Sequence, residues 1–263
     1  MDLVNYYLFY DETYWEIMES FLILFFVGSA AGFINVMAGG GSTLTLPALI
    51  FLGLESSVAN GTNRIAILIQ NIAAIISFKR EKYSKFKISL KLALFTLPGA
   101  VIGAFAAVKV DDELFQKILA VVMIGVVISM IIPRKKITDE NVSGVINNWK
   151  IYPAMFAIGF YGGFIQVGVG FLLMAALLYL MKLNLVFVNM HKVFIVLIYT
   201  IPAIFIFALS GNINWELGLA LAAGNATGGW FAAKLSVKKG EKAVKIVLIG
   251  AIIIMALKLL KVF

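Results

Sequence analysis

Two polar segments inside hydrophobic runs carry the side chains of this chain that could bind a charged solute. They are Asn60-Gly61-Thr62-Asn63-Arg64 and Asn189-Met190-His191-Lys192. Amide groups and a basic side chain inside a membrane span favour an anion, because N–H donors and positive charge complement negatively charged oxygen atoms. No Asp or Glu falls near the middle of any hydrophobic run, which excludes a carboxylate cage for a cation and an acidic proton relay.

A cluster of glycines precedes each polar segment at a matching distance. Gly39-Gly40-Gly41-Ser42-Thr43 precedes the first segment, and Gln166 with Gly168-Val169-Gly170 precedes the second. Unpaired backbone groups are not tolerated in hydrocarbon, so such breaks persist only where protein or a polar cavity satisfies them. A new helix beginning after Gly41, with Ser42 and Thr43 available as caps, would direct its positive end toward an anion.

These two features together define a predicted substrate site with no catalytic residue, no metal ligand and no cofactor. Its candidate residues are Gly39, Gly40, Gly41, Ser42, Thr43, Asn60, Thr62, Asn63, Arg64, Gln166, Gly168, Gly170, Asn189, His191 and Lys192.

Three of these residues have a second interpretation. Arg64 lies roughly 8 Å inside its predicted span at about 1.5 Å per residue, so it could also extend its side chain to the membrane interface. The same holds for Lys192. His191, the only histidine, titrates in the range that a proton-coupled step needs, although a lone histidine also serves as a structural hydrogen-bonding group.

Polar residues continue along one face of each helix that follows a break. In the helix starting near Ala59 they recur at spacings of three, four, seven and eleven: Asn60, Asn63, Arg64, Gln70 and Asn71. The second helix has an equivalent set of Asn189, Lys192, Tyr199 and Thr200. Residues at such spacings share a helix face, so we expect two polar stripes that face each other.

The composition places these elements in a membrane. The 263 residues are 62% hydrophobic with a mean hydropathy of +0.98, more apolar surface than a soluble domain buries. Six apolar segments are long enough to span a bilayer, namely 59–78, 88–108, 114–132, 187–209, 214–233 and 243–262. Four shorter ones form two broken pairs, at 21–38 with 43–54 and at 151–167 with 171–181. The absence of cysteine excludes disulfides and thiolate chemistry.

Loop charges predict the topology. Basic residues are concentrated in loops 79–87, 133–150 and 234–245, which we therefore place in the cytoplasm. The formal charge of +8 is explained by these loops, where basic residues set the orientation in the membrane, and it does not indicate nucleic-acid binding. Each broken pair then enters and leaves on one side, from outside at 20–54 and from inside at 151–182. Both termini are predicted outside the cell membrane.

The chain consists of two inverted repeats on this interpretation. We expect an all-α polytopic membrane protein in which each repeat is a glycine-broken helical hairpin plus three transmembrane helices. The parts are an interfacial segment at 1–20, repeat 1 at 21–132, a cytoplasmic linker at 133–150 and repeat 2 at 151–263. Residues 1–20 carry acids and no Lys or Arg, which argues against a signal peptide. For Gly28 and Gly32 we prefer close helix crossing over binding.

The segment from Gly28 to Gly41, the run Leu46-Pro47-Ala48-Leu49, and Asn60-Gly61-Thr62-Asn63 resemble the TauE/SafE sulfite-exporter family. The resemblance covers about residues 20–260. It implies transport of sulfite or organosulfonates such as sulfoacetate across the cytoplasmic membrane, commonly outward. The second copy departs from the Thr-Asn pattern, with His191-Lys192 in its place.

We therefore expect a secondary transporter, and not an enzyme, that moves a small anion by alternating access. Proton coupling and a homodimer are further expectations. The alternatives are an anion channel on the same scaffold, a transporter of small carboxylates, an intramembrane enzyme, or a purely structural membrane protein. A channel would show no saturation, and an enzyme would need a nucleophile with a base or a metal set, for which one histidine and no mid-span acid are insufficient.

Overall fold

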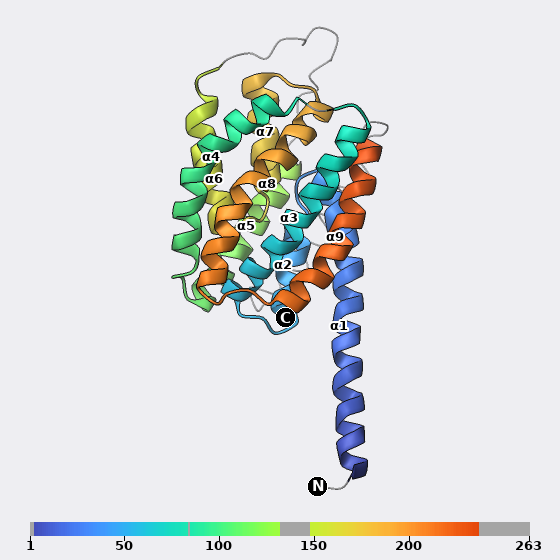
Figure 1. Cartoon of the computed structure of the whole chain (residues 1–263). Coiled ribbons are helices and arrows are strands. Elements are labelled where there is room, and N and C mark those ends of the chain that lie inside the picture. Colours follow the sequence, from blue (N-terminus) through green and yellow to red (C-terminus); the bar gives the residue numbers. More distant parts are fainter. Residues whose placement is uncertain (1–2, 84, 132–147, 237–263) are drawn as a thin grey trace.

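The computed structural model describes residues 3–83, 85–131 and 148–236, and these residues form an all-helical bundle without strands (Figure 1). The prediction of an all-α fold is thereby confirmed. The helices are α1 (Leu3–Met37), α2 (Ser42–Phe51), α3 (Ser56–Arg80), α4 (Phe86–Ala107), α5 (Asp112–Ile131), α6 (Ile151–Phe164), α7 (Val169–Met181), α8 (Leu185–Leu209) and α9 (Trp215–Ser236). The predicted span at 243–262 and most of the linker at 133–150 lie outside the described residues.

Both predicted breaks interrupt the helices. Between α1 and α2 the chain turns at Gly39 with φ +92°, and between α6 and α7 it turns at Gln166 and Gly168 with φ +63° and +73°. Glycine adopts this left-handed region without the steric cost that a side chain imposes, which explains two of the three positions. Gln166 adopts it despite its side chain, a feature typical of functional sites.

Four of the described helices are long and apolar enough to cross a membrane: Met18–Met37 of α1, and α3, α4 and α8. Three of them coincide with predicted spans. The fourth belongs to a predicted broken pair, so the first helix of that pair is longer than its hydrophobic pattern suggested. The predicted spans at 114–132 and 214–233 form α5 and α9, but neither helix is among the four candidate membrane spans. Helix α9 contains four glycines, Asn225 and Thr227, and these residues lower its hydropathy.

The structure places residues 3–20, which the sequence predicts to be an interfacial segment, in the same helix as the hydrophobic residues that follow them. Residues 3–20 belong to α1, which runs for 35 residues without interruption. Figure 1 shows the N-terminal half of this helix projecting beyond the bundle. No glycine or proline occurs between residues 3 and 27, so nothing in the sequence terminates the helix there.

Glycines bring the helices of the two halves into backbone contact. A Cβ atom at Gly28 or Gly32 of α1 would collide with the backbone of α9, and one at Gly159 or Gly163 of α6 would collide with that of α4. The preference for close helix crossing at Gly28 and Gly32 is confirmed. Small residues at such crossings increase van der Waals contact, which stabilises helix pairs in lipid.

The central helices α3 and α8 run in opposite directions, and so do α4 and α9 (Figure 1). Helix α9 packs on α1 and α3, while α4 packs on α6 and α8. Large apolar side chains on the outward faces are exposed, among them Phe26, Phe105 and Phe205. Such an apolar exterior fits a lipid environment. The interior between α3 and α8 holds the polar residues that the sequence placed on two stripes.

Candidate functional site

The two helix breaks meet in the middle of the bundle. A Cβ atom at Gly39 would lie 2.6 Å from the carbonyl carbon of Gly170, and one at Gly170 would overlap the backbone of Gly39. The loops that the sequence predicted to be binding elements are therefore packed against each other, and only residues without side chains permit this approach.

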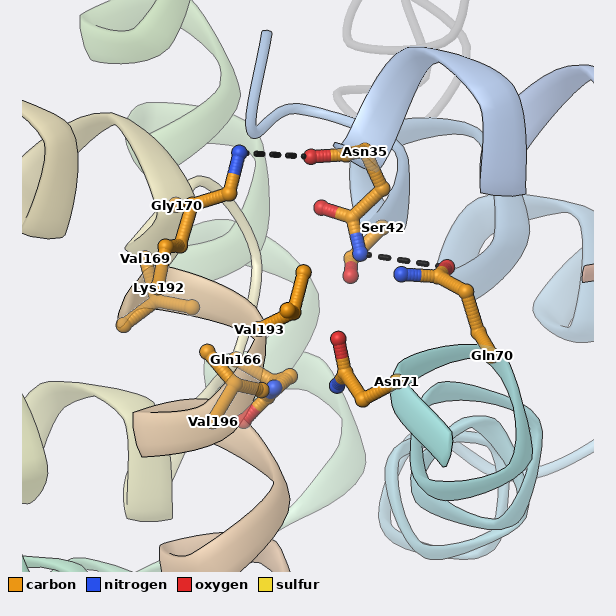
Figure 2. A pocket seen from close by; sticks show the side chains of 10 residues that line it. All are labelled: Asn35, Ser42, Gln70, Asn71, Gln166, Val169, Gly170, Lys192, Val193 and Val196. Carbon is orange, nitrogen blue, oxygen red and sulfur yellow. Dashed lines mark hydrogen bonds between the residues drawn. The ribbon is translucent and has the colours of Figure 1, made fainter. Parts of the chain in front are cut away.

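A small polar cavity lies beside this contact (Figure 2). It has room for roughly one water molecule. Side chains from both halves line it: Asn35, Ser42, Gln70, Asn71, Gln166, Val169, Gly170, Lys192, Val193 and Val196. Among the described residues, the lining contains amides, a hydroxyl and one cation, and none of these lining residues is a carboxylate. A cavity of this chemistry is suited to a ligand that accepts hydrogen bonds.

Two buried amide groups at the cavity have N–H donors without an acceptor. The side-chain Nδ2 of Asn35 donates to Oε1 of Gln70 at 3.2 Å, and this fixes the Gln70 amide while its Nε2 remains unpartnered. Nδ2 of Asn71 is also unpartnered. Figure 2 shows both amide groups at the wall of the cavity. Because a buried donor without an acceptor is unfavourable, each of these groups would gain free energy from an oxygen atom placed in the cavity.

Lys192 supplies the positive charge of the cavity and also holds the end of α1. Its Nζ donates to the carbonyl oxygens of Asn35 and Val36 at 3.0 and 2.9 Å and to Oδ1 of Asn189 at 2.9 Å. The side chain is buried. The carbonyls at the C-terminal end of a helix carry partial negative charge and lack partners within the helix, so a cation there stabilises them.

Arg64 has the corresponding role at the end of α6. Its guanidinium donates to the carbonyl oxygens of Gly162 and Gly163 at 3.0 and 2.6 Å, and more weakly to Oε1 of Gln166 at 3.4 Å. Its Cζ lies 4.7 Å from the ring centroid of Phe207. The residue is fully buried, so the alternative in which it extends to the membrane interface is wrong. Each basic residue thus holds the broken helix of the other half.

Ser42, Gln166, Gly170 and Lys192 are the predicted site residues that line the cavity. Two others on α3 do not line it and bond to neighbouring elements. Asn60 donates through Nδ2 to the carbonyl oxygen of Phe164 at 2.8 Å. Asn63 accepts a hydrogen bond from the hydroxyl of Thr45 at 2.6 Å.

Three other predicted residues are also not among those that line the cavity. Thr62 accepts a hydrogen bond from the backbone N–H of Asn214 at 2.9 Å, just before α9. Nδ1 of His191 lies 2.7 Å from the hydroxyl of Ser89 on α4. Thr43 donates to the carbonyl oxygen of Gly40 at 2.5 Å. The expectation that Ser42 and Thr43 cap α2 is therefore wrong: Gly41 occupies the cap position, and no side chain caps it.

The candidate list missed three polar residues of the cavity. Gln70 and Asn71 were assigned to the polar face of their helix but not to the site. Asn35 ends the segment Gly28-Ser29-Ala30-Ala31-Gly32-Phe33-Ile34-Asn35, which corresponds in the second half to the segment from Gly159 to Gln166. This correspondence could have identified Asn35 as a site residue, because Asn35 and Gln166 stand at the same place before a break and both line the cavity.

The correspondence extends to a pair of hydrogen bonds. Asn35 bonds to Gln70 at 3.2 Å, and Gln166 bonds to Tyr199 at 3.2 Å, with the Tyr199 hydroxyl as donor. Asn35 and Gln166 stand at equivalent positions of the two halves, and so do Gln70 and Tyr199. Equivalent positions in the two halves therefore make equivalent contacts around the cavity.

Comparison with known proteins gives a consistent assignment. The pattern of the sulfite exporter TauE/SafE family matches residues 24–259. A probable membrane transporter protein of Sinorhizobium, ORF9, is 28% identical over 243 residues, covering 90% of this chain and 91% of the relative. The probable membrane transporter protein YfcA of Escherichia coli K12 is 28% identical over 244 residues, covering 90% and 88%. YunE of Bacillus subtilis, with the same description, is 24% identical, covering 92% and 97%. No solved structure matches the chain.

Proposed function

Because this chain belongs to the TauE/SafE sulfite exporter family and is thus a membrane transporter, we propose that it exports a small anion such as sulfite or an organosulfonate. The observation that carries the proposal is the cavity itself. Lys192 and the unpartnered donors of Gln70 and Asn71 line it, and none of its lining residues in the described part of the chain is a carboxylate. Donors of this kind stabilise anionic oxygen atoms, and a buried cation offsets the desolvation of an anion.

We further propose that transport proceeds by alternating access between two inverted repeats in the cytoplasmic membrane, with both termini outside. The opposite directions of α3 and α8, the equivalent packing of α9 and α4, and the paired hydrogen bonds of Asn35 and Gln166 support the repeat. The cavity lies between elements of both halves, which is where transporters of this architecture bind solutes.

The tightness of the cavity favours a transporter over the channel alternative. A space for roughly one water molecule does not admit an organosulfonate unless the surrounding helices separate. If helices must move for each solute that crosses, the rate of this movement limits the flux, which therefore saturates at high concentration. Flux through an open pore instead rises in proportion to concentration.

Flux into proteoliposomes tests the proposal. Sulfite, sulfoacetate, taurine and acetate would each be offered over a range of concentrations, with and without a pH gradient. We expect saturable flux of sulfur oxyanions, slower flux of acetate, and accumulation against a gradient. Flux that never saturates would support the channel alternative, and faster flux of acetate would support the carboxylate alternative.

A charge introduced at Gln70 tests the site. Gln70→Glu would place a carboxylate at the cavity and should reduce the rate at low anion concentration by at least about tenfold, since like charges repel strongly in a low dielectric. Gln70→Met, which removes the donor without adding charge, is the matched control and should have a smaller effect. Equal effects of the two substitutions would show that Gln70 serves packing only.

Proton coupling has two routes in this proposal. In one, His191 carries the proton, so His191→Gln should abolish flux driven by a pH gradient while equilibrium exchange of the anion continues. In the other, a weakly acidic substrate carries the proton itself, and the variant should respond to the gradient as the unsubstituted protein does. His191 bonds to Ser89 and does not line the cavity, which favours the second route.

A further inference from the structure

Two groups of buried polar atoms on α3 and α8 lack a hydrogen-bond partner in the described part of the chain. The first group, at the cavity, consists of Nε2 of Gln70 and Nδ2 of Asn71. The second consists of Nδ2 of Asn63, Nε of Arg64 and the hydroxyl of Thr200. The three side chains of the second group are fully buried and are not among the residues that line the cavity. The cavity therefore does not explain them.

The second group stands where the lining of the cavity has its counterparts in the other half. Asn63 of α3 corresponds to Lys192 of α8, and Thr200 of α8 corresponds to Asn71 of α3. Both Lys192 and Asn71 line the cavity. If the two halves exchanged their conformations, Asn63 and Thr200 would thus take the places that Lys192 and Asn71 have in this structure.

Asn63 and Thr200 also lie at one level of the bundle, because α3 and α8 run in opposite directions (Figure 1). Asn63 precedes Asn71 by eight residues, and Thr200 follows Lys192 by eight residues. Eight residues of an α-helix rise about 12 Å, so both side chains are displaced from the cavity by that distance in the same direction. In the proposed topology this direction leads toward the outside of the cell membrane.

The amide group of Asn63 has the same arrangement of partners as that of Gln70. The hydroxyl of Thr45 donates to Oδ1 of Asn63 at 2.6 Å, as Nδ2 of Asn35 donates to Oε1 of Gln70 at 3.2 Å. In both amides the oxygen is engaged, and the nitrogen has no acceptor among the described residues. Together with the hydroxyl of Thr200, Asn63 therefore offers donors of the kind that favour anionic oxygen atoms.

We propose that Asn63 and Thr200 form a second subsite, about 12 Å outward from the cavity, which binds the transported anion in the opposite access state. This inference rests on the proposed function, in which two inverted repeats export a sulfur oxyanion. In such a cycle each half adopts the conformation that the other half has in this structure, so the counterparts of the cavity lining surround the anion. Arg64, the residue after Asn63, places a positive charge at the same level.

Thr200→Val tests the subsite, because it removes the hydroxyl and keeps the shape of the side chain. Since this hydroxyl has no partner among the described residues, its removal should not lower thermal stability. Sulfite uptake would be measured in right-side-out and in everted membrane vesicles, with vesicles that lack the protein as background. The KM measured from outside, divided by the KM measured from the cytoplasmic side, should rise at least about tenfold, the loss expected for one hydrogen bond to a charged ligand.

Thr96→Val is the matched control. The hydroxyl of Thr96 is equally buried but donates to the carbonyl oxygen of Ala93 at 2.6 Å, so the KM ratio should stay the same. Gln70→Met, at the cavity, should lower the ratio. Opposite shifts for Thr200→Val and Gln70→Met support two subsites, and exchanged signs would only reverse the topology.

Two results would count against the inference in different ways. A KM ratio that Thr200→Val leaves unchanged, or shifts in the same direction as Gln70→Met does, would overturn the second subsite and leave the proposed function intact. Absence of sulfite uptake by the unsubstituted protein in both kinds of vesicle would instead overturn the proposed function, and the inference with it.

A second variant decides the question if Thr200→Val does not fold. Asn63→Asp keeps the oxygen that the hydroxyl of Thr45 contacts and replaces the unpartnered N–H donor by an oxygen that repels an anion. The KM ratio should again rise at least about tenfold. An unchanged ratio in folded Asn63→Asp protein would overturn the second subsite.

Discussion

Arg64→Gln should destabilise the protein more than it weakens anion binding. The sequence predicted that Arg64 contacts the substrate, but its guanidinium lies on the carbonyl groups that end α6 and is not part of the cavity lining. The substitution removes the positive charge and shortens the side chain, so the carbonyl oxygens of Gly162 and Gly163 lose their donors inside the membrane domain.

The two short hydrogen bonds determine the magnitude. They measure 2.6 and 3.0 Å, and a hydrogen bond from a charged donor contributes about 1.5–3 kcal/mol, which gives a loss of about 3–6 kcal/mol before compensation. The bonds at 3.3 and 3.4 Å to Asn60 and Gln166 add less. Removing a buried charge also removes its desolvation cost, and glutamine can restore one donor. A net decrease of about 2–4 kcal/mol in the free energy of unfolding remains.

Unfolding of the purified protein in detergent, followed by circular dichroism, measures this difference. Arg80→Gln is the matched control, because Arg80 is exposed at the end of the same helix and contacts Trp230 through its guanidinium; it should change stability by less than about 1 kcal/mol. Arg64→Lys should recover part of the loss, since an ammonium group can reach one carbonyl. Unchanged stability of Arg64→Gln together with lost sulfite binding would refute the argument and return Arg64 to the binding site.

Three further predictions concern topology, helix packing and the first residue of α5. Cysteines replacing Lys87 and Glu55 should be labelled from opposite sides of the membrane, and labelling from one side would exclude the proposed topology. Gly163→Ala should destabilise the bundle by about 1–3 kcal/mol, because its Cβ would collide with the backbone of α4, whereas Gly125→Ala, which meets no neighbouring atom, should not; equal thermal stability would contradict the close crossing. Partial burial alone would raise the pKa of Asp112, but hydrogen bonds, including one from the first N–H of α3 at 2.5 Å, outweigh it and hold the pKa below its usual value. Asp112→Asn should therefore lower stability at neutral pH, and the difference from the unsubstituted protein should disappear as the pH falls through the lowered pKa; a difference that persists in acid would show that charge is not involved.

The hydrophobic pattern predicted most of the helices, because every helix in a membrane must cover its backbone with apolar side chains over a defined length. Predicted ranges such as 59–78 and 88–108 differ by a few residues from α3 and α4. The hydrophobic pattern did not predict where α1 begins, because this helix starts at Leu3 and the apolar segment starts at residue 21. Its first residues mix acidic and aromatic side chains, and a helix in such a segment depends on the absence of a breaker and not on hydrophobicity.

The duplication in the sequence predicted which two helix breaks correspond, and the structure brings these breaks into contact at Gly39 and Gly170. The sequence could not predict the contacts of its side chains. The cap at Ser42 and Thr43 failed because Gly41 has helical dihedrals, with φ −58° and ψ −36°, and a capping side chain needs an extended backbone before the first turn. The sequence could not predict the partners of Arg64 for another reason. They are two backbone carbonyl groups, and because every residue has a carbonyl group, no sequence pattern identifies them.

Arg64 and Lys192 provide hydrogen-bond donors that the two glycine breaks make necessary. A helix that ends inside the membrane leaves its last carbonyl groups without partners, and neither lipid nor a narrow cavity supplies enough donors. In this protein Lys192 donates to the end of α1 and Arg64 donates to the end of α6, each from a helix of the opposite half. The buried cations and the buried carbonyls thereby satisfy each other. This assignment leaves the neutral amides of Gln70 and Asn71 as the unpartnered donors of the cavity, so the affinity of the site for an anion rests on them and on the field of Lys192.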